Sequence, residues 1–387
     1  MLLLIALAIR VTWGQLQPAE LSPDLPDQME YRALASHLIV GDGLQFFDER
    51  FHGTEYAFRA PGYPMFMAMM GTLPRTVRLG QALLDTSTVL AIYLLARRWL
   101  DERAALVAAG LVAFNPFLIF FTGVMLSETL FTAAIAWGIS LLGRKSWTGA
   151  LCLAVAVLVR PAAMFLPPLL GAVAALLPGR EGATDRPVRD VMGGLFLGAA
   201  ASFVVLLPWA FRNHRVIDQW IWTTTNAGQT TYDGFHNGAT GKSDLSILSQ
   251  MPELLSMSET GRNRYLGQLG YGAMCSDPAR SLSLAVTKVG RTWSPVPLSD
   301  EYGSIRNQLV GLIYAGPLFL LALVGLFRRN LSWPLKSLCL LPAIYFTAGV
   351  MMTVGSLRYR IPAEPPMCLL AAGALCRKSE GRMMNAE

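Results

Sequence analysis

The residues best suited to chemistry in this 387-residue chain include an acidic run near its start, which contains Asp24, Asp27 and Glu30. A carboxylate beside an anionic leaving group can serve as general base for an acceptor hydroxyl or amine. Glu128, at the start of an apolar segment, is a second candidate acid. The simpler interpretation of Asp27 is that it caps a helix that begins near Pro26. The residues alone leave both interpretations open.

Several arginines stand at or near the ends of apolar segments, where long side chains reach the membrane surface. These are Arg59, Arg160, Arg212, Arg358 and Arg360. Any one of them could simply contact lipid headgroups. As a set they favour a bound phosphate or pyrophosphate, because guanidinium groups form charge-assisted and often bidentate hydrogen bonds with phosphate oxygens.

Other kinds of catalytic site have little support. The four histidines lack metal-ligand spacing and the five cysteines form no CxxC pair, so a divalent metal ion is compatible with the chain but not indicated. Nucleophile elbows, P-loops and dinucleotide fingerprints are also missing from the sequence. The free energy for any transfer must therefore arrive with an activated substrate.

The elements that carry these residues are those of a membrane protein. Hydrophobic residues make up 53% of the chain and charged residues 15%, with a mean hydropathy of +0.41, whereas soluble domains have about a quarter charged residues. Long continuous apolar runs indicate helices and not a barrel. The net charge of +6 does not indicate a nucleic-acid partner, because most basic residues lie in short loops between apolar segments.

About ten transmembrane helices are expected, since a span needs roughly 20 apolar residues. They cover residues 2–16, 76–97, 103–121, 125–142, 147–159, 162–178, 191–210, 304–326, 334–354 and 361–376. The first is short and contains Arg10. A cleaved signal peptide is the alternative for it, but a basic leader and a small-residue cleavage pattern are lacking. A shortened first helix, or a start that lies too far downstream, fits better.

Basic residues collect in one set of loops, which the positive-inside rule assigns to the cytoplasm. The two long stretches, residues 17–75 and 211–303, then lie outside, and each is expected to contain helices lying on the membrane surface, near residues 59–70 and 262–289. The expected organisation is a transmembrane module over residues 1–210, a large outer loop over 211–303 and final helices over 304–387. The polar loop 223–241 suits sugar or acceptor contacts, although a flexible polar loop with no ligand role is as good an account.

Six segments, in order along the chain, resemble motifs of one enzyme family. They are residues 27–43, 56–64, 126–131, 159–161, 208–229 and 356–362. Within them stand Tyr-Ala-Phe-Arg-Ala-Pro-Gly-Tyr-Pro, Leu-Ser-Glu-Thr-Leu-Phe, Pro-Trp-Ala-Phe-Arg-Asn and Arg-Tyr-Arg-Ile-Pro. The sequence thereby resembles the GT-C glycosyltransferases of family 39, which group protein O-mannosyltransferases, the lipid A aminoarabinose transferase and bacterial relatives.

This resemblance implies an all-α polytopic membrane protein of the GT-C type, with Asp27 as the catalytic base and Glu128 as a further acid. It also implies that the other motif residues bind substrate, with several of the arginines near the lipid phosphate. These residues are Tyr31, Arg59, Tyr63, Arg160, Arg212, Asn213, Arg358, Tyr359 and Arg360. The chain departs from the family at Gln28, where relatives carry a second acid, and at Ala60, where they carry proline.

The predicted function is transfer of a sugar from a polyprenyl-phosphate donor to an extracytoplasmic acceptor, in a bacterial inner membrane with the site facing outwards. The sequence predicts a lipid bilayer around the protein and no nucleic-acid partner. Two alternatives remain: a lipid-linked glycan polymerase or ligase, and a non-enzymatic flippase or transporter. The first would hand over a longer glycan, and the second could lose Asp27 and still transport.

Overall fold

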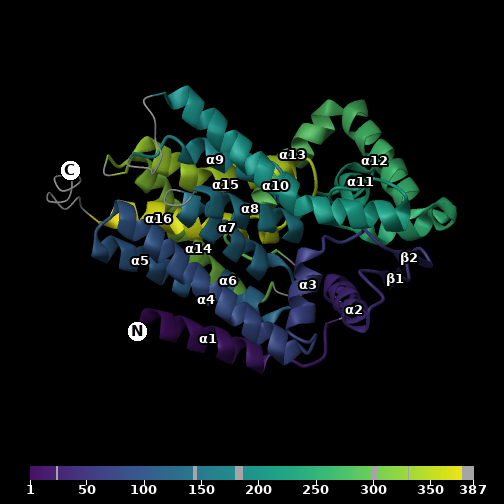
Figure 1. Cartoon of the computed structure of the whole chain (residues 1–387), viewed down its shortest axis with the longest axis horizontal. Coiled ribbons are helices and arrows are strands. Elements are labelled where there is room, and N and C mark those ends of the chain that lie inside the picture. Colours follow the sequence, from purple (N-terminus) through teal and green to yellow (C-terminus); the bar gives the residue numbers. More distant parts are fainter. Residues whose placement is uncertain (23–24, 143–145, 179–185, 299–302, 330, 377–387) are drawn as a thin grey trace.

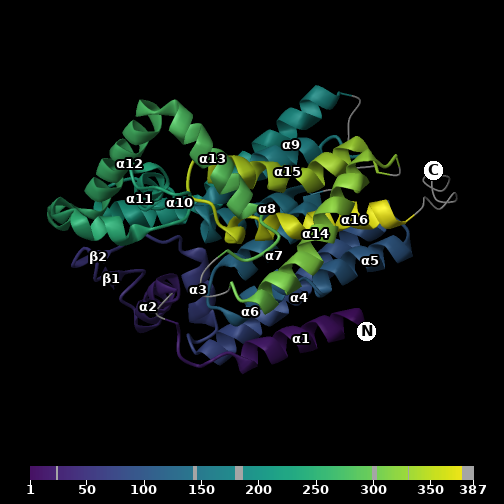
Figure 2. The same ribbon diagram turned by 180° about the vertical axis from the view of Figure 1, so that it is seen from behind.

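The computed structural model describes residues 1–22, 25–142, 146–178, 186–298, 303–329 and 331–376, which are mostly helical. Figure 1 and Figure 2 show an elongated bundle of roughly aligned helices, with smaller helices and a two-stranded sheet at one end. Asp24 and part of the predicted basic loops, including Arg144, Lys145, Arg377 and Lys378, lie outside the described residues.

Each predicted span coincides with a helix or with a bent helix pair. The bundle contains α1 (Leu2–Leu16), α4 (Pro74–Trp99), α5 (Glu102–Ala113), α6 (Pro116–Gly123), α7 (Glu128–Leu142), α8 (Ser146–Val159), α9 (Leu166–Ala174), α10 (Pro187–Ile217), α14 (Ile305–Phe327), α15 (Trp333–Met351) and α16 (Glu364–Leu375). By length and apolarity, α4, α10, α14 and α15 can each cross a membrane, and so can α5 with α6, which meet at 44°. The chain is a multi-pass membrane protein, and the count of ten spans stays a prediction.

One helix extends further than its predicted span. Residues 211–217, assigned to the outer loop, continue α10, which ends where Asp218 adopts a left-handed conformation with φ of 58°. Pro208 lies inside this helix without ending it. The last turns of α10 therefore carry Arg212 and Asn213 beyond the predicted end of the span.

The first outer segment contains α2 (Pro26–Val40), a hairpin of β1 (Phe46–Asp48) and β2 (Gly53–Glu55), and α3 (Gly62–Met69). The second contains α11 (Ala227–Phe235), α12 (Glu259–Ser276) and α13 (Pro278–Thr292). Helices predicted near 59–70 and 262–289 are confirmed as helices. The polar loop 223–241 contains α11 in its middle, and whether it contacts a ligand stays open. The hairpin was not predicted.

Both outer segments lie at one end of the bundle. In Figure 1 and Figure 2, α2, β1, β2, α11 and α12 gather at the end opposite the start of α1. Glu259 joins the two segments: its carboxylate accepts the backbone N–H groups of Tyr56 and Ala57, at 2.8 and 2.9 Å, and the Thr225 hydroxyl. The two stretches thus form one layer over the outer ends of the helices.

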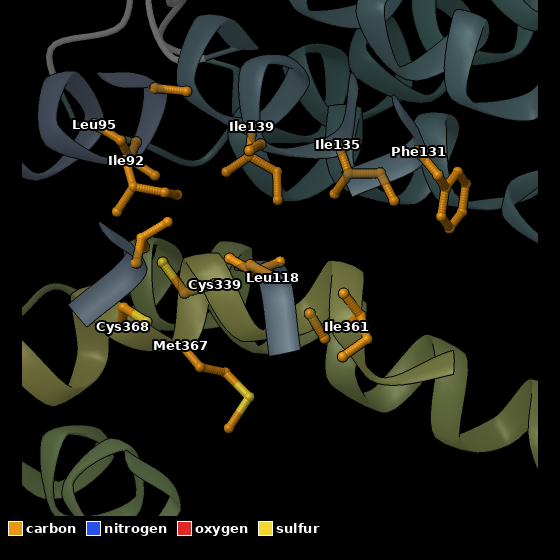
Figure 3. Close-up of a cluster of buried hydrophobic side chains, with 14 of the residues drawn as sticks. Ile92, Leu95, Leu118, Phe131, Ile135, Ile139, Cys339, Ile361, Met367 and Cys368 are labelled. Carbon is orange, nitrogen blue, oxygen red and sulfur yellow. The ribbon is translucent and has the colours of Figure 1, made fainter. Parts of the chain in front are cut away.

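The bundle core is apolar and closely packed. Figure 3 shows side chains of α4 and α7, such as Ile92 and Ile135, facing those of α15 and α16, such as Cys339 and Cys368, across the core. Helices approach most closely at small residues, as membrane helices commonly do. A methyl group on Gly171 of α9 would lie 2.3 Å from a backbone oxygen of α10.

Two buried polar networks hold the break between α5 and α6, where Pro116 lacks an N–H group. Arg10 of α1 donates to the carbonyls of Val112 and Ala113, at 3.1 and 2.8 Å, and its Nε lies 2.5 Å from Asp85 Oδ2. The Asn115 side-chain oxygen caps α6, at 2.9 and 3.2 Å from two backbone nitrogens. This places Asp85 in an ion pair that joins three helices.

Candidate active site

Eight charged side chains alternate in sign at the end of the bundle where the segments of α2 and α11 lie. In order of contact they are Asp48, Arg50, Glu30, Arg59, Asp27, Arg358, Glu128 and Arg160, and we call them the charge cluster. They come from α2, the hairpin, the turn before α3, the start of α7, the residue after α8 and the turn before α16. Segments more than 300 residues apart in sequence thus meet here, since Arg358 contacts Asp27 331 residues away.

Asp27 lies at the centre of the cluster. Leu25 is the N-cap of α2 and Pro26 begins the helix, so Asp27 falls in the first turn and is not the capping residue. The capping interpretation is therefore wrong. Asp27 Oδ1 instead accepts from Arg59 Nη2 at 2.6 Å, and Oδ2 accepts from both terminal nitrogens of Arg358 at 3.2 Å.

Arg358 links Asp27 to the second candidate acid. Its Nε donates to Oε1 of Glu128, which also accepts from Arg160 Nη2 at 3.1 Å. Glu128 is fully buried, and among the described residues its Oε2 has no hydrogen-bond partner. The Arg160 guanidinium carbon lies 5.8 Å from the centre of the Tyr359 ring, in the range of a cation–π contact.

The far side of the cluster contains residues that sequence analysis did not assign. Arg59 Nε donates to Glu30 at 2.6 Å, and Arg50 joins Glu30, at 2.9 Å, to Asp48, at 2.6 Å. Glu30 belongs to the acidic run singled out in the sequence, whereas Arg50 and Asp48 carry no distinguishing sequence signal. Their place depends on the β1–β2 hairpin, in which Asp48 is the last residue of the first strand.

The two acids in α2 differ in electrostatic environment. Burial by itself would raise the pKa of Asp27, but Arg59 and Arg358 outweigh it and hold the pKa below the ordinary value of 3.8. For Glu30 burial dominates, and its pKa rises above the ordinary value despite Arg59 and Arg50. Asp27 is therefore ionised and fully paired in the structure as it stands.

Aromatic residues support the centre of the cluster. The Arg59 guanidinium lies 5.5 Å from the centre of the Tyr31 ring, which meets the Tyr63 ring edge-on at 4.9 Å. Tyr63 is fully buried, and its hydroxyl donates to the Gln81 side chain at 2.6 Å. Tyr31 therefore contacts Arg59 of the charge cluster, whereas Tyr63 packs against Tyr31.

Three predicted substrate-binding residues, Arg212, Asn213 and Arg360, make their hydrogen bonds away from the charge cluster. Arg212 donates to the carbonyls of Tyr56 and Leu44, at 2.7 and 2.6 Å, and Asn213 donates to that of Ile221 at 2.9 Å. These contacts hold the outer segments to the end of α10. The third residue, Arg360, makes its contacts inside the bundle.

Arg360 is fully buried and pairs with Glu364 at 2.7 Å. It also donates to the Ser294 carbonyl. The hydrogen bonds of Arg212, Asn213 and Arg360 thus go to backbone carbonyls and to Glu364, and the assignment of these residues to substrate binding stays a prediction.

A metal ion has little to bind in the part of the chain that the structure describes. There, no group of three His, Cys, Asp or Glu side chains could hold one. The carboxylates of the charge cluster each face at least one guanidinium. The arrangement suits an anionic ligand, which the arginines could bind, and a carboxylate able to accept a proton.

Comparisons with known proteins bear on the family and the fold. Residues 63–210, less than half of the chain, match the family model described as dolichyl-phosphate-mannose-protein mannosyltransferase. No curated protein sequence matches the chain.

Among solved structures, the oligosaccharyltransferase AglB from Archaeoglobus fulgidus, in complex with an inhibitory peptide and a dolichol-phosphate, is similar at a TM-score of 0.57 and 16% identity. The match covers 97% of this chain and 49% of AglB, so the chain spans about half the length of that enzyme. The apo form of the Archaeoglobus fulgidus enzyme gives the same TM-score at 17% identity, covering 97% of this chain and 50% of that one.

ArnT from Cupriavidus metallidurans, bound to undecaprenyl phosphate, matches at a TM-score of 0.41 and 14% identity, covering 97% of this chain and 77% of ArnT. The family match and the AglB likeness together confirm the resemblance to the GT-C glycosyltransferases that the sequence motifs indicated.

Proposed function

We propose that this chain, a membrane protein with the GT-C glycosyltransferase fold, transfers a sugar from a polyprenyl-phosphate donor to an extracytoplasmic acceptor. The observation that carries the proposal is the contact of Asp27 with two arginines, Arg59 and Arg358, at the outer end of the bundle. One candidate base and two phosphate-binding groups thus lie within hydrogen-bonding distance of each other.

The reaction that suits this arrangement is a single displacement. The acceptor hydroxyl or amine attacks the anomeric carbon, Asp27 takes its proton, and the bond from that carbon to the phosphate oxygen breaks. The electron pair of that bond leaves with the polyprenyl phosphate, whose charge Arg358 and Arg59 stabilise. One direct displacement inverts the anomeric centre.

The proposed partners follow from the same chemistry. The donor is a polyprenyl-phosphate sugar that enters from the bilayer, and the acceptor is a glycan, lipid or protein on the outer side. The AglB structure contains a dolichol-phosphate and a peptide, which is the same pair of ligand classes. We place the protein in a bacterial inner membrane with the charge cluster facing away from the cytoplasm, as the basic loops predict.

The test is sugar transfer by the purified protein from a panel of polyprenyl-phosphate monosaccharides, with candidate acceptors supplied. Asp27→Asn should abolish turnover while Asp42→Asn, an exposed residue of the same outer segment, should not. Turnover that survives Asp27→Asn would transfer the role of base to Glu128 or another acid.

The alternatives give different results in this assay. Wild-type protein that binds the donor but transfers nothing to any acceptor would favour a transporter. Transfer of a lipid-linked oligosaccharide in preference to every monosaccharide would favour the ligase alternative.

A further inference from the structure

We infer that the donor phosphate releases the catalytic base, by taking the terminal nitrogens of Arg358 away from Asp27 Oδ2. The inference rests on the proposed function and concerns how the site becomes active. In the structure as it stands, Asp27 is held by two arginines and is a weak base. Donor binding would change that through an exchange of partners.

Every arginine of the charge cluster is already paired with a carboxylate. The cluster contains four carboxylates and four guanidinium groups, and each of these arginines contacts at least one carboxylate. A phosphodiester that enters this site can gain an arginine only by sharing it with a carboxylate or by displacing that carboxylate. Binding and rearrangement are therefore the same event.

The pair that opens most easily is Asp27 with Arg358. Their contacts, at 3.2 Å, are longer than the 2.6 Å contact of Asp27 with Arg59. Their side chains are partly accessible, at 28% exposed for Arg358 and 23% for Asp27, whereas Glu128 is fully enclosed. An anion arriving from the lipid or from solvent can therefore reach this pair.

Arg358 is held in a way that permits the exchange. Its Nε donates to Glu128, and its terminal nitrogens donate to Asp27. The edge that faces Asp27 is the edge that a phosphate binds with two parallel hydrogen bonds. A phosphate can accept hydrogen bonds from those two terminal nitrogens while the bond from Arg358 Nε to Glu128 stays intact. The guanidinium then needs only to rotate about that bond.

The exchange alters the two oxygens of Asp27 differently. Oδ1 keeps Arg59, which continues to orient the carboxylate, and Oδ2 loses both of its donors. The net charge of the cluster falls from zero to −1 when a phosphodiester enters. Both changes raise the proton affinity of Asp27, and Oδ2 is the oxygen that becomes free to accept the acceptor's proton.

This arrangement makes an unusual prediction about affinity. Because Asp27 competes with phosphate for Arg358, Asp27→Asn should bind polyprenyl phosphate, the donor without its sugar, more tightly than the wild type. We expect a roughly ten- to hundredfold lower Kd, the size of one charge-assisted hydrogen bond. The same variant should transfer no sugar.

Two controls separate the exchange from a general change of charge. Glu30→Gln removes an equal charge from the cluster without touching Arg358, and should lower the Kd less. In an Arg358→Lys background the effect of Asp27→Asn should largely vanish, because lysine cannot offer the bidentate edge. The coupling between the two substitutions thus measures the competition itself.

The outcomes are distinguishable. If the wild type transfers sugar but Asp27→Asn binds polyprenyl phosphate no more tightly, the exchange is refuted and the proposed function stands. Weaker binding would refute it as well, since Asp27 would then help to hold the phosphate. If the wild type neither binds polyprenyl phosphate nor transfers sugar, both proposals fail.

A second measurement covers the case in which the variant does not fold. Adding polyprenyl phosphate to the wild-type protein should shift a carboxylate stretching band in the infrared difference spectrum, as Oδ2 loses its hydrogen bonds. Lipid phosphate that binds without any such shift would contradict the exchange.

Discussion

The ion pair between Arg10 and Asp85 gives the sharpest test of how the bundle is held together. Arg10 is fully buried in a helix otherwise made mostly of apolar residues, and its guanidinium contacts Asp85 and the carbonyls of Val112 and Ala113. Arg10→Met would keep an unbranched side chain and remove all of these donors. It would leave the Asp85 carboxylate buried without its partner.

The expected loss follows from that geometry. Breaking a buried pair by removing one partner costs about 3–5 kcal/mol, and two carbonyls at the end of α5 would also lose a donor. At about 1.4 kcal/mol per tenfold change, the unfolding equilibrium should shift by roughly two to three and a half orders of magnitude. Removing both charges, as Arg10→Met with Asp85→Leu, should recover a large part of the loss.

The assay is unfolding of the purified protein in mild detergent by added SDS, followed by helical circular dichroism. Arg32→Met, an exposed arginine of α2, serves as control and should change stability by less than about 0.5 kcal/mol. If Arg10→Met lies within about 1 kcal/mol of the wild type, or if the double variant is no better than the single one, the pair does not hold the three helices as argued.

Three further predictions concern the site and its surroundings. Glu259→Gln should weaken the joint between the outer segments by about 1–3 kcal/mol and speed limited proteolysis there, while the exposed Glu253→Gln should not. Arg360→Gln should destabilise the protein by about 3 kcal/mol, because Glu364 stays buried, and raise the KM for donor, whereas the exposed Arg306→Gln should change neither.

The third prediction is a pH dependence. Since the pKa of Asp27 lies below its ordinary 3.8 in the free protein, kcat/KM for the donor should stay level as pH falls to about 4. The stability that the Asp27 pairs contribute is likewise complete above 3.8 and is lost only below it. The acid limb of kcat should lie at higher pH, because bound donor raises the pKa. If the acid limbs of the kcat and kcat/KM profiles fall at the same pH, the predicted rise in the pKa of Asp27 on donor binding is contradicted.

The sequence was sufficient to predict the membrane class, the helical segments and the GT-C resemblance, because each rests on local signals: long apolar runs and short motifs. It also named Asp27, Glu128, Arg160 and Arg358, which the structure brings together. It could not separate them from Arg212 or Arg360, since an arginine in a family motif has the same sequence signal whether it faces the site or a backbone carbonyl. The roles of Arg50 and Asp48 depend on a hairpin whose strands have three residues each.

Arg360 links the proposed phosphate site to buried charges inside the bundle. Arg358 has to keep its position when its bonds to Asp27 are exchanged, and it stands in a short turn two residues before Arg360. Glu364 holds Arg360 at 2.7 Å and accepts from Asn115 at 2.6 Å, while Asn115 also caps α6.

On the α5 side of the break between α5 and α6, Arg10 donates hydrogen bonds to the carbonyls of Val112 and Ala113. The turn that carries Arg358 is thus connected, through Arg360 and Glu364, to Asn115 at the break between α5 and α6. Asn115 forms hydrogen bonds with Glu364, Phe117 and Leu118, none of which belongs to the charge cluster. We nevertheless expect a substitution at Asn115 to lower donor affinity. Asn115→Ala with an unchanged donor KM would contradict this coupling.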